Sequence, residues 1–227
     1  MPKVLISDKL SAESVKVFEK YGIDVEINTN LSEKNLNNKI GSFDGLAIRS
    51  STQVTKKTLE YANNLKIIGR AGIGVDNIDL DMATQKGIIV MNTPFGNSIT
   101  TAEHTIALMM ALSRNIPLAN TSTHEGKWEK SLFTGTELYS KVLGMIGCGN
   151  IGSIVADRAQ GLKMQVKVYD PFLTDDRAKE IGVQKLNFDE LLKVSDFLTL
   201  HVPLTNSTKN IINSNSLRKM KKGSKII

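Results

Sequence analysis

The chain has 227 residues, of which 41% are hydrophobic and 23% charged, a balance typical of a folded globular protein with one or two domains. It contains no apolar run long enough for a membrane span or a secretory signal, so no membrane association is expected. The net charge of +6 comes from dispersed lysines and arginines without interleaved aromatic residues, which argues against nucleic-acid binding. A single cysteine, Cys148, excludes an internal disulfide and favours a reducing, cytoplasmic location.

Short apolar runs alternate with helix-like segments over the first 90 residues. The runs predict buried strands, and the segments between them predict helices because their apolar residues recur at helical spacing. The predicted strands are residues 4–6, 25–27, 46–48, 67–68 and 88–90. The predicted helices are residues 11–21, 54–62 and 79–85. This alternation is typical of a parallel sheet covered by helices on both faces.

A run of turn residues, 92–97, separates this unit from a second alternating unit. We therefore predict one domain over residues 1–96 and another over residues 97–227. In the second unit the predicted strands are residues 142–146, 165–169, 197–200 and 225–227, and the predicted helices are residues 151–161, 175–181, 188–194 and 213–220. The chain is thus expected to belong to the α/β class, with two parallel-sheet domains.

The segment behind the junction predicts a subunit contact. Thr100 and Glu103 predict a capping box at the start of a helix whose residues 106–112 are apolar on every face. A helix of that kind is expected to lie between domains or between subunits. Residues 115–136 show no sustained periodicity and predict an extended arm. Helix and arm, residues 98–140, therefore predict a homodimer or homotetramer.

The second unit contains a GxGxxG motif, Gly147-Cys148-Gly149-Asn150-Ile151-Gly152, between a predicted strand and a predicted helix. Gly147 can make the tight turn, Gly149 lets a pyrophosphate approach the backbone, and Gly152 lets helix and strand pack closely. The free N–H groups of the helix start then face the phosphates. The alternative is a glycine turn without function, followed by an Asp that only caps a helix. Cys148 lies on this turn, and because the chain has no second cysteine we interpret it as a small buried thiol.

Asp170 supplies the second half of the dinucleotide fingerprint, because it ends the next predicted strand 18 residues after Gly152. A carboxylate there can accept hydrogen bonds from ribose hydroxyls and repel a 2′-phosphate, which predicts NAD rather than NADP. His201, Val202 and Pro203 follow a later strand and should border the cofactor for the same topological reason. We interpret His201 as a binding-site residue and not as the acid–base group.

An anion site is also predicted in the first unit. Gly72 and Gly74 follow a predicted strand and would expose backbone N–H groups suited to a carboxylate, and Arg49, at the end of its own predicted strand, is a second candidate for binding an anion. A plain strand-to-helix turn, capped by Asn77 or Asp79, explains the glycines equally well. The histidines are scattered and unpaired with cysteines, so no metal site is predicted.

Together these motifs resemble the D-isomer-specific 2-hydroxyacid dehydrogenases over essentially the whole chain. Residues 69–79 resemble the family's substrate loop, and residues 92–98 resemble its hinge. Residues 126–128 and 133–138 resemble the arm of one branch, whose substrate carries a phosphate. The resemblance implies a flavodoxin-like substrate domain followed by an incomplete Rossmann nucleotide-binding domain.

The resemblance also implies two sets of contacts. The implied NAD contacts are Ile73, Asn150, Ile151, Asp170 and Val202. The implied contacts to a small anionic 2-hydroxy or 2-keto acid are Arg49, Gly72, Ile73, Gly74 and Asn97. Lys130 on the arm would reach the substrate phosphate bound to the partner subunit.

The family transfers hydride between nicotinamide and the hydroxyl-bearing carbon of the acid, using an Arg anchor and a His paired with a Glu. All three match motifs beyond residue 227, so this chain is expected to be part of a longer enzyme and to be inactive alone. Two alternatives stay open. The substrate could instead be that of a glyoxylate-, hydroxypyruvate- or lactate-type relative, and some relatives of this fold are NAD-sensing corepressors.

Overall fold

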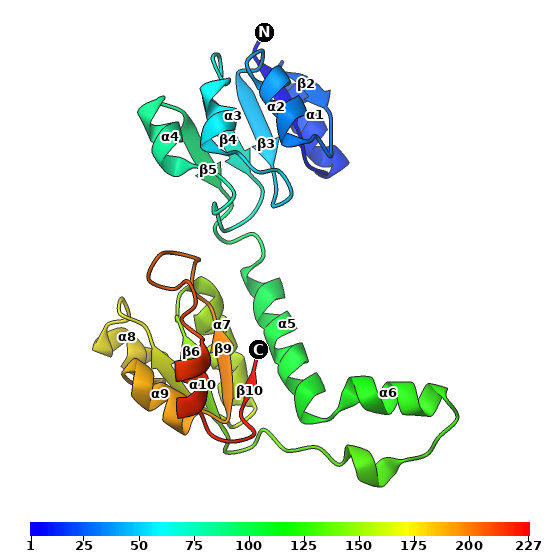
Figure 1. Ribbon diagram of the computed structural model, residues 1–227, viewed down its shortest axis with the longest axis vertical. Coiled ribbons are helices and arrows are strands. Elements are labelled where there is room, and N and C mark those ends of the chain that lie inside the picture. Colours follow the sequence, from blue (N-terminus) through cyan, green and yellow to red (C-terminus); the bar gives the residue numbers. More distant parts are fainter. The chain divides into compact units, whose positions relative to one another are not determined.

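The computed structural model describes residues 1–227, which form two compact units, Met1–Asn97 (unit 1) and Ser98–Ile227 (unit 2) (Figure 1). Each unit contains one five-stranded sheet in which all strands run parallel. The α/β class predicted from the strand–helix alternation is therefore confirmed. None of the helices is long and apolar enough to cross a membrane.

Unit 1 has the strand order of flavodoxin-like sheets, β2-β1-β3-β4-β5, which reverses direction between β1 and β3. Its strands are β1 (Lys3–Ile6), β2 (Asp24–Ile27), β3 (Gly45–Ile48), β4 (Ile67–Arg70) and β5 (Ile89–Asn92). Its helices are α1 (Ala12–Lys20), α2 (Glu33–Ile40), α3 (Lys56–Glu60) and α4 (Leu80–Gln85). One face of the sheet packs against α1, and the other packs against α2, α3 and α4.

Helix α2 is absent from the predicted elements. Only Leu36 and Ile40 mark its buried apolar face, and polar residues fill the rest of its eight positions. The Ser32 side chain caps the helix by accepting a hydrogen bond from the N–H of Asn35. Two apolar residues four apart are too few to reveal a helical period, although they complete the unit 1 core.

Unit 2 has the order β10-β9-β6-β7-β8, which is that of a Rossmann sheet with its switch point between β6 and β9. Its strands are β6 (Val142–Ile146), β7 (Gln165–Tyr169), β8 (Gln184–Lys185), β9 (Phe197–Leu200) and β10 (Lys225–Ile226). Its helices are α5 (Ser98–Ser113), α6 (Ile116–His124), the 3₁₀ helix η1 (Lys130–Phe133), α7 (Asn150–Gly161), α8 (Asp175–Glu180), α9 (Phe188–Val194) and α10 (Ser214–Lys219). Helices α5, α7 and α8 cover one face of the sheet, and α9 covers the other.

The predicted capping box of α5 is wrong. The helix begins at Ser98, so Thr100 and Glu103 lie inside it and form no reciprocal cap. The prediction fails because the apolar residues 106–112 do not indicate the residue at which the helix begins. In the single chain α5 buries one face through Ala102 and Met109, whereas its other faces remain exposed.

The arm predicted over residues 115–136 is not extended chain, because this segment folds into α6 and η1 (Figure 1). Helix α6 starts behind Asn115, whose φ of 53° ends α5. Polar side chains of α6 bond to carbonyls one turn back, as Thr121 does to Pro117 and Thr123 to Ala119. Because Ser122 is the buried residue of α6, no apolar face marks this helix in the sequence.

Candidate functional site

The glycine motif lies at the carboxyl end of β6, beside the switch point of unit 2. Gly147 has a φ of +90°, and a Cβ there would lie 2.5 Å from the carbonyl oxygen of His201. A Cβ on Gly152 would lie 2.6 Å from the carbonyl oxygen of Gly147, so β6 and α7 pack closely at this point. A Cβ on Gly149 would meet nothing within 4 Å, which leaves its backbone open to a ligand.

Helix α7 begins at Asn150 and Ile151 directly behind the open glycine. No side chain caps it, so its first N–H groups have no acceptor from a capping residue. Free N–H groups and the positive end of the helix dipole favour an anion at this place. Backbone, rather than charged side chains, therefore makes this end of unit 2 suited to a pyrophosphate.

Asp170 lies at the carboxyl end of β7 and binds the glycine loop directly. Its Oδ2 accepts a hydrogen bond from the N–H of Cys148 at 2.8 Å, and its Oδ1 accepts one from the N–H of Phe172 at 2.8 Å. A neighbouring cavity of about 440 Å³ is lined by Tyr169, Asp170 and Pro171. These two bonds orient the Asp170 side chain. Each carboxylate oxygen can accept a further hydrogen bond, so Asp170 is still able to accept hydrogen bonds from ribose hydroxyls.

His201 follows β9 and donates its backbone N–H to the carbonyl of Ile146 at 2.8 Å. Its Nε2 lies 3.1 Å from the hydroxyl of Thr199. Burial lowers the pKa of His201 to about 4, so the ring is neutral at pH 7. The side chain of Val202 lies against Gly147, with Cγ1 2.7 Å from the place of a Cβ there. His201, Val202 and Pro203 thus begin a loop that borders the glycine turn.

Cys148 is a buried thiol inside the motif. Burial, and after it the negative charge of Asp170, raises the pKa of Cys148 to about 11. The thiol therefore stays protonated near neutral pH and is a poor nucleophile.

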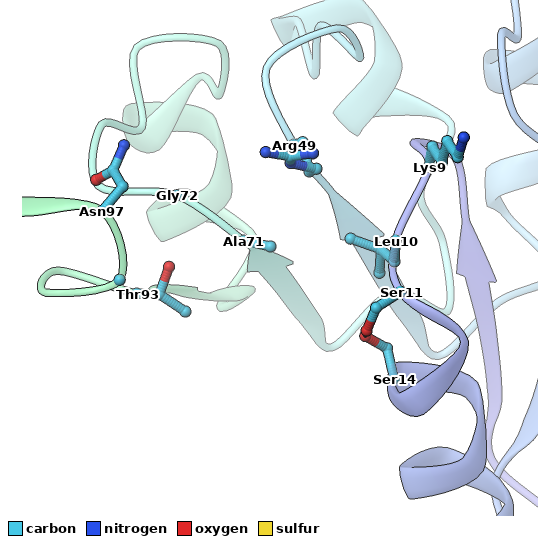
Figure 2. Close-up of a pocket in the computed structure, with 10 residues that line it drawn as sticks. Lys9, Leu10, Ser11, Ser14, Arg49, Ala71, Gly72, Thr93 and Asn97 are labelled. Atoms are coloured by element: carbon cyan, nitrogen blue, oxygen red, sulfur yellow. The ribbon is translucent and has the colours of Figure 1, made fainter. Parts of the chain in front are cut away.

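Unit 1 has a cavity of about 660 Å³ at the carboxyl ends of its strands, next to the switch point between β1 and β3 (Figure 2). Three predicted substrate contacts, Arg49, Gly72 and Asn97, line it. The other lining residues are Lys9, Leu10, Ser11, Ser14, Ala71, Thr93 and Gly96. No hydrogen bond or ion pair within the protein engages the Arg49 guanidinium, so this charge is available to a ligand.

Ile73 and Gly74 do not line this cavity, although they belong to the same loop as Gly72. The carbonyl of Ile73 accepts a hydrogen bond from Asn92 Nδ2 at 2.7 Å, and the carbonyl of Gly74 accepts one from Arg70. Of the two residues proposed to cap the following helix, Asp79 is the cap of α4 and accepts from the N–H of Met82. Asn77 has different partners, which are described below.

Lys9, Ser11 and Ser14 are cavity residues that the sequence reading missed (Figure 2). They follow β1 at the same sheet edge as Arg49, which follows β3. One rule could have identified them: in an open parallel sheet, ligands bind where the connections after two neighbouring strands leave toward opposite faces of the sheet. Applying it requires the order of the strands, which the sequence alone did not supply.

Comparison with known proteins bears on both units. Residues 106–227 match the family described as D-isomer specific 2-hydroxyacid dehydrogenase, NAD binding domain. The D-3-phosphoglycerate dehydrogenase of Archaeoglobus fulgidus is 47% identical over 97% of this chain and 42% of its own length. The enzyme of that name from Synechocystis is 46% identical over 100% of this chain and 41% of its own length.

Among solved structures, the cofactor(NAD+)-bound 3-phosphoglycerate dehydrogenase of Entamoeba histolytica aligns with a TM-score of 0.82 and 31% identity. That alignment covers 99% of this chain and 70% of the Entamoeba chain. This chain spans about two fifths of the length of the curated relatives. The family's NAD binding domain, matched by residues 106–227, covers more than half of the chain. The chain therefore belongs to the D-isomer-specific 2-hydroxyacid dehydrogenase family.

Proposed function

We propose that this chain supplies the NAD-binding and substrate-binding units of a D-3-phosphoglycerate dehydrogenase. The complete enzyme would oxidise 3-phospho-D-glycerate to 3-phosphohydroxypyruvate, the reaction that opens serine synthesis. The observation that carries the proposal is the 46–47% identity to enzymes of that name, which extends through both units and the arm. Residues 1–96 would form the substrate-binding part, and residues 97–227 the NAD-binding domain.

The glycine loop of unit 2 fits the cofactor. The open backbone at Gly149 and the uncapped start of α7 suit a pyrophosphate, and Asp170 suits the adenosine ribose. When bound, NAD supplies the acceptor for the hydride of the substrate's hydroxyl-bearing carbon. Asn150, Ile151 and the loop that starts at His201 would border the cofactor. A contact from Ile73 remains a prediction from the family resemblance.

The cavity of unit 1 fits a small acid with two anionic groups. Arg49 and Lys9 bring two positive charges to its wall, and Ser11 and Ser14 bring hydroxyl donors. An Arg can hold a carboxylate or a phosphate through two parallel hydrogen bonds. The backbone of Gly72 and the amide of Asn97 add neutral polar groups on the same cavity.

The oligomeric part of the proposal places a second copy of the chain on α5 and the arm. Leu108 and Leu112 on α5 and Trp128 on the arm are 43%, 45% and 86% exposed. Large apolar side chains exposed along one continuous segment mark an interaction surface. In such a homodimer or homotetramer, Lys130 would lie near the partner's substrate phosphate.

The test is a substrate panel with the full-length protein. NADH oxidation is followed with 3-phosphohydroxypyruvate, glyoxylate, hydroxypyruvate, pyruvate and a branched-chain 2-keto acid, and then with NADPH in place of NADH. The proposal expects the highest kcat/KM with 3-phosphohydroxypyruvate and NADH. A higher kcat/KM for one of the unphosphorylated acids would replace the substrate but keep the family chemistry. No turnover with any acid would contradict the enzyme assignment itself.

A further inference from the structure

The segment from Arg49 to Thr52 is held from one side by a buried carboxylate. Asp8 is 6% exposed, and its Oδ2 accepts hydrogen bonds from the N–H of Arg49 at 2.6 Å and the N–H of Thr52 at 3.2 Å. Its Oδ1 accepts from the Thr52 hydroxyl at 3.0 Å. The hydroxyl of Ser7, also buried, lies 2.9 Å from the same Thr52 hydroxyl. All the hydrogen bonds of Asp8 thus go to this one segment.

A second buried side chain holds the same segment through its carbonyls. Asn77 is 5% exposed, and its Nδ2 donates to the carbonyls of Arg49 at 2.8 Å and Thr52 at 2.7 Å. The N–H and the C=O of Arg49 are therefore both fixed, one by Asp8 and the other by Asn77. With its backbone fixed at both peptide groups, the direction in which the Arg49 side chain leaves the chain is determined.

Burial of the Asp8 carboxylate lowers the folding stability of the protein unless it is compensated. A buried carboxylate without a cationic partner must be compensated by hydrogen bonds, and Asp8 forms no ion pair. Apolar side chains would fill the end of a buried strand without that cost. The polar groups are instead concentrated on the segment that carries Arg49, whose guanidinium is left free beside the cavity.

We propose that Asp8 and Asn77 are positioning residues that set Arg49 for the anionic group of the substrate. The inference rests on the proposed function in taking Arg49 as a substrate contact. Neither residue touches the substrate. Each acts through the backbone of Arg49, and their loss would let the guanidinium move away from the place where the anion is bound.

The test compares kinetic constants of full-length variants. Asp8→Asn keeps the volume and one acceptor oxygen, so the fold should persist, which near-UV circular dichroism checks. We expect its KM for the acid to rise about tenfold, the equivalent of one lost charge-assisted hydrogen bond. The kcat and the KM for NADH should change less than twofold, because an anchor remote from the reacting carbon binds ground and transition states alike.

The Arg49→Ala variant tests whether Asp8 acts through Arg49. We expect it to raise the KM for the acid about 100-fold, as loss of a charged anchor does. If Asp8 acts through Arg49, Asp8→Asn has no further effect on KM in that background. Asn77→Ala should behave like Asp8→Asn in both backgrounds, and it reaches the segment by an independent contact.

Asp44→Asn is the matched control. Asp44 also binds a backbone N–H of a neighbouring strand, that of Lys3 at 3.0 Å, but it precedes β3 and so lies at the opposite edge of the sheet from Arg49. Its KM for the acid should equal that of the unmodified protein. A fall in kcat at constant KM for Asp8→Asn would indicate loss of folded enzyme only and would overturn the inference. The inference would also be overturned if Asp8→Asn still raised the KM for the acid tenfold in the Arg49→Ala background.

The result also separates this inference from the proposed function. If the preferred acid is not the phosphorylated one, the same variants are compared with the preferred acid. The KM pattern then tests the positioning of Arg49 independently of the name of the substrate.

Discussion

Asp170 serves two partners, because its carboxylate binds the backbone of the glycine loop and also faces the cavity where the ribose is proposed to bind. Asp170→Ser removes the negative charge that would repel a 2′-phosphate. We expect NADH to bind about tenfold more weakly and the preference for NADH over NADPH to fall ten- to a hundredfold. Cofactor fluorescence titration measures both affinities.

Asp189→Asn is the control for this change, because it removes one negative charge of unit 2 elsewhere, in the ion pair with Lys219. It should leave both cofactor affinities unchanged. An Asp170→Ser protein with the original preference would show that Asp170 does not face the ribose.

His201 predicts a specific acid sensitivity. Its pKa of about 4 in the folded protein lies below the value of about 6.5 in the unfolded chain, because burial disfavours the charged ring. The unfolded chain therefore binds a proton first as the pH falls. Stability is lost between pH 6.5 and pH 4, by about 3 kcal/mol, and this contribution levels off below pH 4.

His201→Gln tests that expectation, since glutamine can keep a polar contact to Thr199 and does not titrate. Urea unfolding at several pH values should show a smaller loss of unfolding free energy for the variant between pH 6.5 and pH 4. Equal losses for both proteins would mean that His201 is charged at no cost in the folded state.

At the scale of elements, Gly149 and Gly152, both at the start of α7, differ in what surrounds them. Gly149→Ala adds a methyl group to open space at a negative φ, so the unfolding free energy should change by less than about 1 kcal/mol. The same methyl group would occupy the place proposed for the pyrophosphate, and NADH affinity should fall at least tenfold.

Gly152→Ala should instead affect the unfolding free energy more than the NADH affinity. Its methyl group would lie 2.6 Å from the carbonyl oxygen of Gly147, so α7 must move away from β6. Overpacking of this kind costs about 1–3 kcal/mol of stability. Urea unfolding together with NADH titration of both variants separates the two roles. Equal stability losses at Gly149 and Gly152 would contradict the distinction.

The elements that the sequence predicts well are those with strong apolar contrast. The strand before the glycine motif has Leu143 and Met145 fully buried, and α9 has Leu191 and Leu192 fully buried, so their patterns stand out. Helix α6 and the two-residue strand β8 lack such contrast. Strand β8 forms by pairing with β7, and α6 packs against α5 and η1, so the residues of β8 and α6 do not by themselves indicate these elements.

The same limit applies to the candidate sites. Residues 147–152 could be recognised because strand, glycines and helix are consecutive in the sequence, whereas Lys9 and Arg49 meet only when β1 and β3 pair. The carbonyl contacts of Asn77 were likewise out of reach, since its spacing suggested a helix cap. Sites built from one segment are therefore readable, and sites built from several need the topology.

At the scale of the whole molecule, exposed apolar side chains are concentrated on the segment from α5 to η1. They are Ile99, Leu108, Met110, Leu112, Ile116, Leu118, Trp128 and Leu132. Within unit 2, α6 packs mainly against its neighbours α5 and η1 (Figure 1). An apolar surface of this kind is expected to be covered, and the proposed occupant is the same segment of a second copy.

The double variant Leu108→Glu/Leu112→Glu tests this dimer, because the two side chains lie one helical turn apart on the exposed face of α5. Burial of a leucine contributes about 1.5–3 kcal/mol, and two-fold symmetry presents each substitution twice. The dimer dissociation constant should therefore rise by at least a hundredfold. Sedimentation velocity from nanomolar to micromolar concentration measures it. Val17→Glu/Tyr21→Glu is the control, with the same spacing of four residues at the C-terminal end of α1, where Tyr21 is the C-cap residue, and with exposures of 55% and 72%. Because α1 lies outside the proposed interface, this control should sediment like the unmodified protein. A dimer that survives the α5 substitutions but dissociates with those on α1 would move the interface to unit 1.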